Sequence, residues 1–529
     1  MDARDAEPGL AVVAPKSLVL PVFPLAPRPA YALAAASGVV YFLGFPGVNL
    51  WPLSFVALVP LLVALRGQTP KRATGLGLVH GMFISFTGFY WLFGMLQRFS
   101  GFPAPLCVIF MLALCAYQGG RTALLGLLHA RAEQRGWPSA PAFALAFVAS
   151  ELVYPLLFPW YYGACVHNAP ALLQAADLGG PYLVGLTLVA PNLALAELIF
   201  ARCERRAIGR HLVATGLAIP AIAAIYGGVR LRQINLAIAA AEPIIVGIVQ
   251  PNEPLKGATN VLATHLRMTT FLREAGVGLV LWSEGADRHT YPEEHYEELA
   301  KKEITHRLGV PAIIGTSISR KTETFRRTHF NTALLSDADG TILGRYDKQI
   351  LLAFGEYLPL GTTFPILHRW SPSSGRFSPG TSLDPLIFGA HRLSVIICYE
   401  DIFPDLVNRM VRHADPDLII NLTNDTWFGD TTEPLEHLAL AQLRAVEHRR
   451  YLIRATNSGL SAIVDAAGRI VMRGGQYREE ALIGEARFLR QRTGYEFVGD
   501  APWYACTLAI ALMALVDKKR LGRGKPRPS

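Results

Sequence analysis

The sequence is poor in charged residues. Only 17% of its 529 residues are Asp, Glu, Lys or Arg, whereas soluble domains average about 25%. Hydrophobic residues make up 51% of the chain, and the mean hydropathy is +0.29. This composition indicates that part of the chain lies in lipid. The net charge of +9 does not predict a nucleic-acid partner, because much of the excess lies in short clusters beside apolar segments.

The sequence also lacks paired cysteines and a clear signal-peptide cleavage pattern. The six cysteines have no CxxC pair and no regular spacing, so neither a metal site nor a disulfide framework is predicted. They are Cys107, Cys115, Cys165, Cys203, Cys398 and Cys506. Beyond residue 230 only Cys398 and Cys506 remain, and Cys506 falls in a final apolar stretch. Cys398 is therefore the only thiol expected in a water-soluble domain.

Long apolar segments dominate the first part of the chain. Spanning the hydrocarbon core takes about 20 apolar residues, and eight segments approach that length. They lie near 31–48, 50–66, 73–96, 103–127, 139–160, 181–201, 212–229 and 502–516. Only Gly47-Val48-Asn49 separates the first two, so they could also form one long element. Residues 231–500 have the balance of charges and turns typical of a soluble domain.

The charges of the loops predict a topology. Lys and Arg cluster after every second segment, at 66–72, 131–135, 202–210 and 518–525. The other loops are nearly bare, except for Arg98 after the third segment and Arg230 and Arg232 at the outer end of the seventh. Positive loops stay on the cytoplasmic side. The pattern predicts five parts: a cytoplasmic tail, a seven-helix membrane domain, an outward-facing soluble domain, an eighth transmembrane helix and a basic cytoplasmic tail. Their ranges are 1–30, 31–230, 231–500, 501–517 and 518–529.

The soluble part alternates strand-like and helix-like stretches. Short apolar strands are predicted at 244–249, 277–282, 312–316, 331–335, 393–398, 418–422 and 452–456, and helices at 257–274, 292–308, 404–413 and 433–449. This alternation favours an α/β domain whose sheet is covered by helices. Asp339-Gly340 indicates a hairpin between 331–335 and 341–345, so the sheet is expected to be mixed.

Three polar residues follow strands of this domain. Glu284 ends one strand, Lys348 follows another, and Cys398 ends a third. Each has an ordinary interpretation when taken alone: a solvated strand end, a surface lysine and a packed thiol. Together they are the types that acyl transfer by a thiol needs, because a carboxylate can take the thiol proton and a cation can stabilise the oxyanion. A remote histidine as the base is not excluded by the spacing.

These residues and their surroundings resemble the nitrilase (carbon–nitrogen hydrolase) superfamily. The motifs are Trp282-Ser283-Glu284, Lys348 ahead of Phe354-Gly355-Glu356-Tyr357, Cys398-Tyr399-Glu400, Asn424-Asp425-Thr426-Trp427-Phe428-Gly429 and Arg454-Ala455-Thr456-Asn457-Ser458-Gly459. With its membrane flanks, the whole chain resembles the apolipoprotein N-acyltransferases of the bacterial inner membrane. The resemblance implies a periplasmic αββα sandwich for residues 231–500, with Glu284, Lys348 and Cys398 in a pocket that faces the membrane.

The resemblance also implies a ping-pong reaction. Cys398 would attack the sn-1 ester of a phospholipid with Glu284 as base, and Lys348 would stabilise the oxyanion. The thioester would then pass its acyl chain to the α-amine of an S-diacylglyceryl-cysteine apolipoprotein. It implies no cofactor and no metal, and we expect a monomer.

Supporting roles follow from the same motifs. Glu356 would support the lysine and the base, Glu400 the nucleophile turn, and Tyr399 the surroundings of the thiol. Trp427 would line or gate the acyl groove, with Phe354 and Asn424 in support. Two departures from the family pattern stand out: Ala353 where proline is common, and Gly257-Ala258 where Trp-Asp is common.

Three other functions fit parts of the sequence. One is a membrane-tethered amidase acting on a small carbon–nitrogen substrate, for which eight spans would be an excess of anchor. Another is a paralogous acyltransferase with a different acceptor. The third is a transporter or lipid-binding scaffold, which predicts a polar path through the spans. Only His80, Arg121 and Glu151 offer themselves for such a path, and the last two could instead pair as structural glue.

Overall fold

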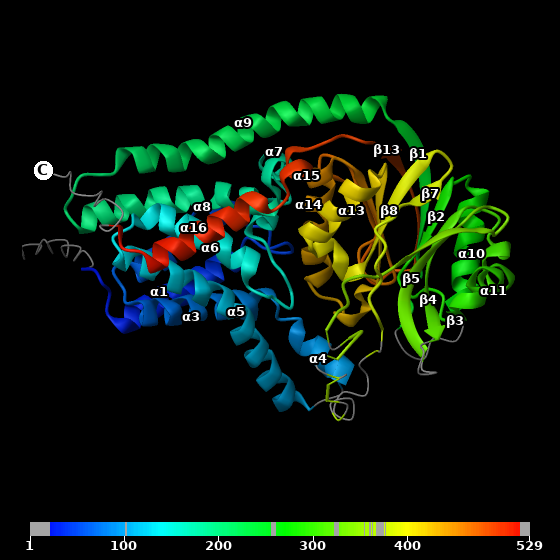
Figure 1. The fold of residues 1–529 in the computed structure, drawn as a ribbon, viewed down its shortest axis with the longest axis horizontal. Helices are drawn as coiled ribbons and strands as arrows, with labels where there is room; N and C mark the ends of the chain where they lie inside the picture. The colour runs from blue at the N-terminus through cyan, green and yellow to red at the C-terminus, as the bar shows by residue number, and fades with distance from the viewer. Residues whose placement is uncertain are drawn as a thin grey trace, which may run out of the picture.

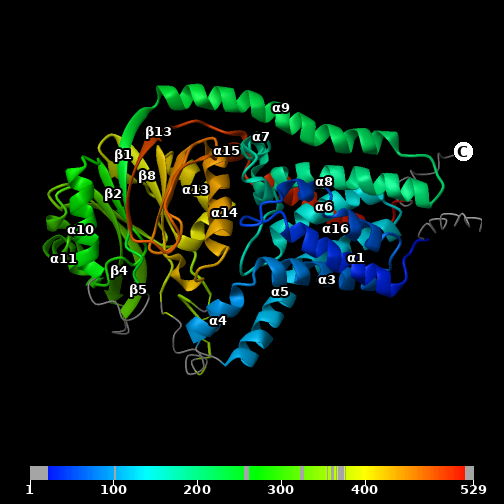
Figure 2. The ribbon, with the colours of Figure 1, turned by 180° about the vertical axis from the view of Figure 1, so that it is seen from behind.

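The structure, a computed structural model, consists of a helical domain and an α/β sandwich joined side by side (Figures 1 and 2). It describes residues 22–100, 103–254, 261–321, 327–353, 355–358, 361, 363–364, 366, 375 and 377–518. The helical domain is built from the N-terminal part of the chain and from the last helix, which returns to it after the sandwich.

The helical domain contains long helices and several short ones. They are α1 (Pro27–Phe42), η1 (Trp51–Phe55), α2 (Val59–Leu65), α3 (Pro70–Gly88), α4 (Leu92–Ser100), α5 (Ala104–Gln134), α6 (Ser139–Val153), η2 (Tyr162–Val166), α7 (Pro170–Leu173), α8 (Ala176–Cys203), α9 (Arg210–Ala240) and α16 (Ala501–Leu515). Each of the eight predicted apolar segments holds at least one of these helices. Among the described residues, α5, α8 and α9 are long and apolar enough to cross a membrane. Helices α3 and α4 make a fourth candidate only as a pair bent by 63°.

Three spans, or up to four, are thus supported by length and composition, and the count of eight stays a prediction. Two of the other apolar segments are interrupted by residues that end helices. Helix α1 ends at Phe42, shortly before Pro46 and Gly47, and Gly47 has a φ of +94°. Helix α6 ends at Val153, and Pro155 follows. Hydropathy counts apolar residues over a window, so it does not register these breaks.

Two sheets form the centre of the sandwich. In the described residues one sheet has seven strands in the order β13-β1-β2-β4-β5-β6, with β3 beside β4, and the other has six in the order β12-β11-β10-β9-β8-β7. The first contains β1 (Glu242–Gln250), β2 (Leu279–Trp282), β3 (Thr290–Pro292), β4 (Ala312–Lys321), β5 (Arg327–Ser336), β6 (Ile342–Asp347) and β13 (Glu480–Phe488). The second contains β7 (Leu386–Phe388), β8 (His391–Ile397), β9 (Leu418–Thr423), β10 (Tyr451–Thr456), β11 (Ala462–Val464) and β12 (Ile470–Arg473).

Both sheets are mixed, and all seven predicted strands are present. Strands β1, β2 and β4 are parallel, whereas β4, β5 and β6 are antiparallel, with the hairpin turn at the predicted Asp339-Gly340. Strands β8, β9 and β10 are also parallel, and their side chains are nearly all buried. Such strands read as continuous apolar runs because helices and the other sheet cover both faces.

Helices cover the outer face of each sheet (Figure 1). The first sheet carries α10 (Val261–Glu274) and α11 (Tyr296–Glu303), and the second carries α13 (Pro404–Ala414) and α14 (Glu433–His448). The predicted αββα arrangement is therefore confirmed. Helix 292–308 is shorter than predicted, since η3 (Glu293–His295) and η4 (Thr305–Arg307) flank α11. The short helix α15 (Gly494–Val498) leads from the sandwich to α16, and α14 lies on the side of the sandwich that meets the helical domain (Figures 1 and 2).

A single helix joins the two domains. Helix α9 runs along one edge of the molecule from Arg210 to Ala240 and passes into β1 after one residue (Figure 1). The predicted domain boundary at residue 230 falls inside this helix. Residues 231–240 contain neither glycine nor proline and include three Ala and two Leu, so they extend the helix instead of ending it.

Candidate active site

Cys398 lies directly after β8, where the chain turns sharply into η5 (Cys398–Ile402). Its φ of +53° is in the left-handed region, which is uncommon for a residue with a Cβ. The buried carboxylate of Glu400 holds this turn: its Oε2 accepts from the backbone N–H of Ile397 at 2.7 Å, and its Oε1 from those of Gln349 and Ile350 at 2.6 and 3.0 Å. Glu400 thus joins the thiol turn to the segment that carries Lys348.

Lys348 and two carboxylates lie together. The Lys348 Nζ is 3.1 Å from Glu284 Oε1 and 2.9 Å from Glu356 Oε2, and its side chain is only 1% exposed. Asn331 Nδ2 donates to Glu284 Oε1 at 2.7 Å and to Glu356 Oε1 at 2.8 Å. Glu356 Oε2 also accepts from the backbone N–H of Leu352 at 2.8 Å. An ammonium and an amide therefore clamp both acids in one arrangement.

The electrostatics keep Cys398 protonated at rest. Burial raises the pKa of the thiol well above its usual value, and the Glu284 and Asp425 carboxylates raise it further, while Lys348 opposes them. Burial alone would lower the pKa of Lys348, but Glu284 and Glu356 outweigh it and raise that pKa well above its usual value. The thiol therefore needs a base to become a nucleophile, and Lys348 stays a cation.

A buried ionic network supports the thiol loop from the other side. Arg454 Nη1 donates to Asp401 Oδ2 at 2.5 Å, and Nη2 donates to both oxygens of Asp425 at 3.1 and 3.2 Å. His437 Nε2 is 2.7 Å from Asp401 Oδ1, and its Nδ1 is 2.8 Å from Arg454 Nη2. His437 Nδ1 also lies 3.3 Å from Asp425 Oδ1. Burial and Arg454 lower the pKa of His437, but Asp401 and Asp425 outweigh them and raise it to about 10.

Asp425, Glu433 and His437 lie close enough together for each to offer one ligand atom to a metal ion. They do not fit that use, because the Arg454 guanidinium already holds both oxygens of Asp425. A divalent cation placed there would meet this fixed positive charge. The cluster therefore acts as internal scaffolding.

The helical domain lies against the thiol loop. The Tyr399 hydroxyl, beside the thiol, donates to the carbonyl of Leu157 in the helical domain. The loop after β9 contains η6 (Asp425–Trp427), and Asn424 Oδ1 accepts from the hydroxyl of Thr426 at 2.6 Å to hold it. Trp427 is partly buried against the main core. Local hydrogen bonds therefore help to hold this loop.

Trp91, between α3 and α4, joins this loop to α14. Its ring packs edge-on against Phe428 with 5.0 Å between centroids, and its Nε1 donates to Glu436 Oε2 at 3.3 Å. Burial raises the pKa of Glu436 to about 8. Arg98 of α4 donates from Nη2 to the Phe428 carbonyl at 2.6 Å. The loop that follows Asp425 is thus fixed by residues of both domains.

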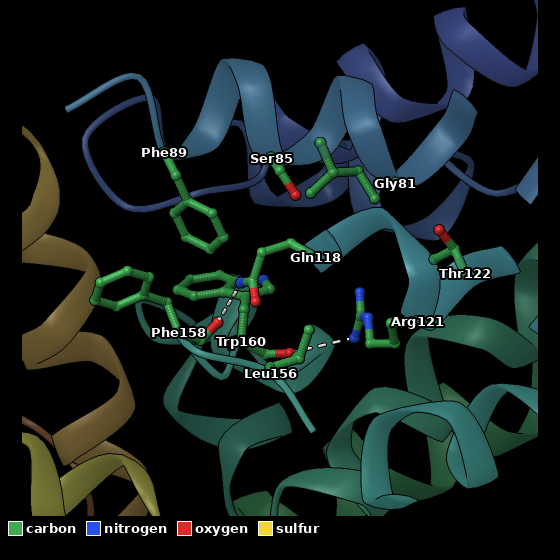
Figure 3. A pocket seen from close by; sticks show the side chains of 10 residues that line it. Gly81, Ser85, Phe89, Gln118, Arg121, Thr122, Leu156, Phe158 and Trp160 are labelled. Atoms are coloured by element: carbon green, nitrogen blue, oxygen red, sulfur yellow. Dashed lines mark hydrogen bonds between the residues drawn. The ribbon is translucent and has the colours of Figure 1, made fainter. Parts of the chain in front are cut away.

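A small pocket lies in the helical domain (Figure 3). It holds about 20 Å³, which is room for about one water molecule. Gln118 Nε2 donates to the Phe158 carbonyl at 2.8 Å, and Arg121 Nη1 to the Trp160 carbonyl at 3.2 Å. The pocket is too small for an acyl chain.

Arg121 is also paired with Glu151 at 2.9 Å, as the structural-glue interpretation predicts. This ion pair is not by itself the polar path through the helices that a transporter would need. His80 is buried nearby on α3, and both of its ring nitrogens lack a hydrogen-bond partner among the described residues.

Most of the predicted site residues come together. Glu284, Lys348 and Glu356 are in contact, Cys398 is near enough for their charges to act on it, and Tyr399, Glu400, Asn424 and Trp427 surround the same loops. Phe354 and Gly257-Ala258 lie outside the described residues; Ala353 forms an isolated bridge with Tyr357.

Sequence reasoning missed Asn331 and the Arg454 network. Asn331 could have been found from the hairpin, because the register that pairs Thr332 with Asp347 also places Asn331 opposite Lys348. Arg454 and Asp425 lie in two separate motifs, Asp401 follows a third, and His437 lies on α14 outside any motif. Each of these stretches read separately gives no sign that they meet.

Family comparisons agree with this geometry. Residues 245–490 match the model of the carbon–nitrogen hydrolases, and residues 37–194 match that of the apolipoprotein N-acyltransferase N-terminal domain. The site is thus that of a nitrilase-type α/β domain, here attached to a helical domain with candidate membrane spans.

Relatives match over nearly the whole chain. The apolipoprotein N-acyltransferase of Geobacter metallireducens is 30% identical over 518 residues, which cover 96% of this chain and 98% of that protein. The one from Azotobacter vinelandii is 29% identical, with 95% and 97% covered. This chain therefore belongs to the apolipoprotein N-acyltransferase family. Among solved structures, Saccharomyces cerevisiae Nit3 of the nitrilase superfamily has a TM-score of 0.35 and 21% identity, with 49% of this chain and 95% of that chain covered.

Proposed function

We propose that this protein transfers an acyl chain from a membrane phospholipid to the N-terminal α-amine of S-diacylglyceryl-cysteine apolipoproteins. The observation that carries the proposal is Cys398 at a strained turn, beside a carboxylate–ammonium cluster, with the neighbouring Tyr399 hydrogen-bonded to the helical domain. A nucleophile that is seated against a membrane domain is suited to substrates that stay in the bilayer. Both the acyl donor and the acceptor are anchored there by their own lipid chains.

In the first half-reaction Glu284 takes the proton of the Cys398 thiol as sulfur attacks the carbonyl carbon of the sn-1 ester. The Lys348 ammonium stabilises the negative charge that develops on the carbonyl oxygen. The ester C–O bond then breaks, Glu284 returns the proton to the departing glycerol oxygen, and a lysophospholipid leaves. The acyl chain remains on Cys398 as a thioester.

In the second half-reaction the free α-amine of the apolipoprotein attacks the thioester carbonyl. Glu284 takes a proton from the amine, the C–S bond breaks, and the sulfur regains a proton. An amide is more stable than a thioester, so this step runs forward. Water has to stay out of the site meanwhile, since hydrolysis would waste the intermediate. Trp427 would line or gate the acyl groove, and Phe354 would support the site.

We place the protein in the bacterial inner membrane as a multi-pass monomer with the sandwich in the periplasm. The alternation of positive and bare loops supports this orientation. The domain ranges proposed from the sequence follow from it, except that the junction near residue 230 lies inside α9. A reporter fused near residue 330 should give a periplasmic signal, and a cytoplasmic signal would overturn the orientation.

Mass spectrometry of the purified protein after incubation with phosphatidylethanolamine tests the chemistry. An acyl adduct is expected on Cys398, and it should disappear when an apolipoprotein peptide carrying S-diacylglyceryl-cysteine is added. Cys398→Ala should form no adduct while still inserting into membranes. Continued acylation of the peptide by this variant would refute the mechanism, and release of ammonia from simple amides by the native protein would favour the tethered amidase.

A further inference from the structure

Arg98 is an exception in the charge pattern of the chain. The predicted outward loops contain almost no Lys or Arg, and Arg98 lies in one of them. Positive charge on that side of a membrane is disfavoured, so this arginine calls for a reason. It belongs to α4, the helix that follows the 63° bend after the apolar helix α3.

The guanidinium of Arg98 is held in a fixed position on the loop after β9. Its Nη2 donates to the Phe428 carbonyl at 2.6 Å. The next residue, Gly429, has a φ of +74°, and a Cβ there would come within 2.1 Å of Arg98 Nη1. Glycine therefore leaves the space that the guanidinium fills, and the side chain is fixed where it meets the sandwich.

Arg98 has no acidic partner. No carboxylate of the described residues lies within 4.0 Å of its guanidinium, whereas Arg66, Arg206 and Arg230 of the helical domain all form ion pairs. A bond to a neutral carbonyl leaves the positive charge uncompensated. Arg98 is also solvent-exposed, so an anion can approach it. A planar guanidinium is well suited to phosphate, which it can bind through two parallel hydrogen bonds.

The position of the Arg98 guanidinium is close to the thiol and to lipid. Phe428 comes three residues after Asp425, whose charge acts on Cys398, and the intervening η6 turn rises by about 2 Å per residue. In a phospholipid roughly 7 Å of glycerol and ester bonds separate the phosphorus from the sn-1 carbonyl carbon. Beside α4, the first turns of α5 expose Val108, Ile109 and Leu112, as a lipid-facing surface does (Figure 1).

We propose that Arg98 binds the phosphate of the donor phospholipid and thereby positions its sn-1 ester at Cys398. The inference rests on the proposed acyl transfer and adds a residue that selects the donor. A phosphodiester anion would supply the counter-charge that the protein does not. An uncharged diacylglycerol carries the same ester and lacks the phosphate, so it would gain nothing from Arg98.

Comparing these two donors tests the proposal. The full-length protein in detergent is incubated with phosphatidylethanolamine or with diacylglycerol, and the rate of adduct formation on Cys398 is followed against donor concentration by mass spectrometry. For Arg98→Gln, the concentration of phosphatidylethanolamine that gives half the maximal rate should rise about ten- to a hundredfold. With diacylglycerol the increase should be much smaller, because only the bond to the Phe428 carbonyl is lost.

Two further variants sharpen the outcome. Arg98→Lys keeps the charge without the planar fork and should fall between native and Gln. Arg473→Gln, at the exposed end of β12, is the matched control and should change neither donor. An equal loss with both donors would overturn the proposal, because Arg98 would then only hold the loop, and no loss with either donor would overturn it as well. A native protein that forms no adduct with any donor would instead overturn the acyl transfer itself.

Discussion

Replacing Asp177 with asparagine should destabilise the junction between the two domains. Asp177 of α8 is buried and accepts from four groups: Arg449 Nη2 at 2.5 Å and Nε at 3.2 Å, Arg230 Nε at 2.9 Å and the Tyr226 hydroxyl at 2.6 Å. Arg449, at the end of α14, is itself fully buried. Asparagine keeps the shape but removes the charge, so the Arg449 guanidinium would be left buried without its counter-ion.

The magnitude follows from that burial. Breaking a buried ion pair by removing one partner costs about 3–5 kcal/mol. For a domain of 150–250 residues each kcal/mol lowers the melting temperature by about 2–4 °C, so Asp177→Asn should lower it by about 6–20 °C. Asp405→Asn is the control, because Asp405 and Arg409 form an exposed pair on one helix, and such pairs contribute only about 0.3–0.5 kcal/mol.

Thermal unfolding of the purified proteins in one detergent measures both variants. Cys398 acylation at 20 °C confirms that each variant is folded before heating. A melting temperature for Asp177→Asn that falls no further than that of Asp405→Asn would refute the reasoning. The double variant Asp177→Asn with Arg449→Met should lose less than the sum of the two single changes, because the stranded charge is gone.

Three other expectations concern the site. Glu284→Gln should lower the pH at which Cys398 becomes reactive to iodoacetamide, since the Glu284 carboxylate raises the pKa of the thiol. Peptide mapping of the iodoacetamide adduct at several pH values measures this pH. An inflection at or above the pH found for the native protein contradicts the expectation. Asn331→Ala should slow adduct formation at least about tenfold, because a hydrogen bond to a charged group contributes about 1.5–3 kcal/mol; a native rate would rule out its role in holding Glu284 and Glu356. Glu400→Gln should lower the free energy of unfolding by about 1–3 kcal/mol, because an amide group would face backbone N–H donors. Burial raises the pKa of Glu400 to about 7. The difference in free energy of unfolding between the native protein and Glu400→Gln is therefore largest below about pH 4.5 and should narrow as the pH rises to 7. Denaturant titrations at several pH values measure this difference, and a constant or widening difference contradicts the expectation.

The sheet positions were predictable because buried strands are short apolar runs with clear ends. Val-Ile-Ile before Cys398 and Val-Leu-Trp before Glu284 each read as strands, and a polar residue directly after such a run falls at the sheet edge. Residue type alone then suggested thiol, base and cation. The clamp by Asn331 depends on which residues of the two hairpin strands face each other. The turn dipeptide marks the position of the turn alone.

Long-range pairs were beyond sequence reasoning. Arg449 and Asp177 are separated by 272 positions, and nothing local marks either as the partner of the other. Glu400 was expected to hold the turn at the thiol, but nothing in the sequence marks its bonds to the backbone of Gln349 and Ile350. The spans were hard to count for a different reason: hydropathy sums a composition, while a helix ends at individual prolines and glycines.

Helix α9 has a mechanical consequence. Its 31 residues extend over about 46 Å at about 1.5 Å per residue, whereas a hydrocarbon core is about 30 Å thick. In the proposed orientation the helix extends about 16 Å beyond the hydrocarbon core, toward the sandwich. Arg487 holds its end by donating to the Ala239 and Ala241 carbonyls. One residue added to this spacer would lift the first strand by about 1.5 Å and rotate it by about 100°. The length of α9 and the rotation at its end thus set the height at which the thiol meets an ester. A substrate is therefore selected by the depth of its ester bond in the bilayer as well as by its chemistry.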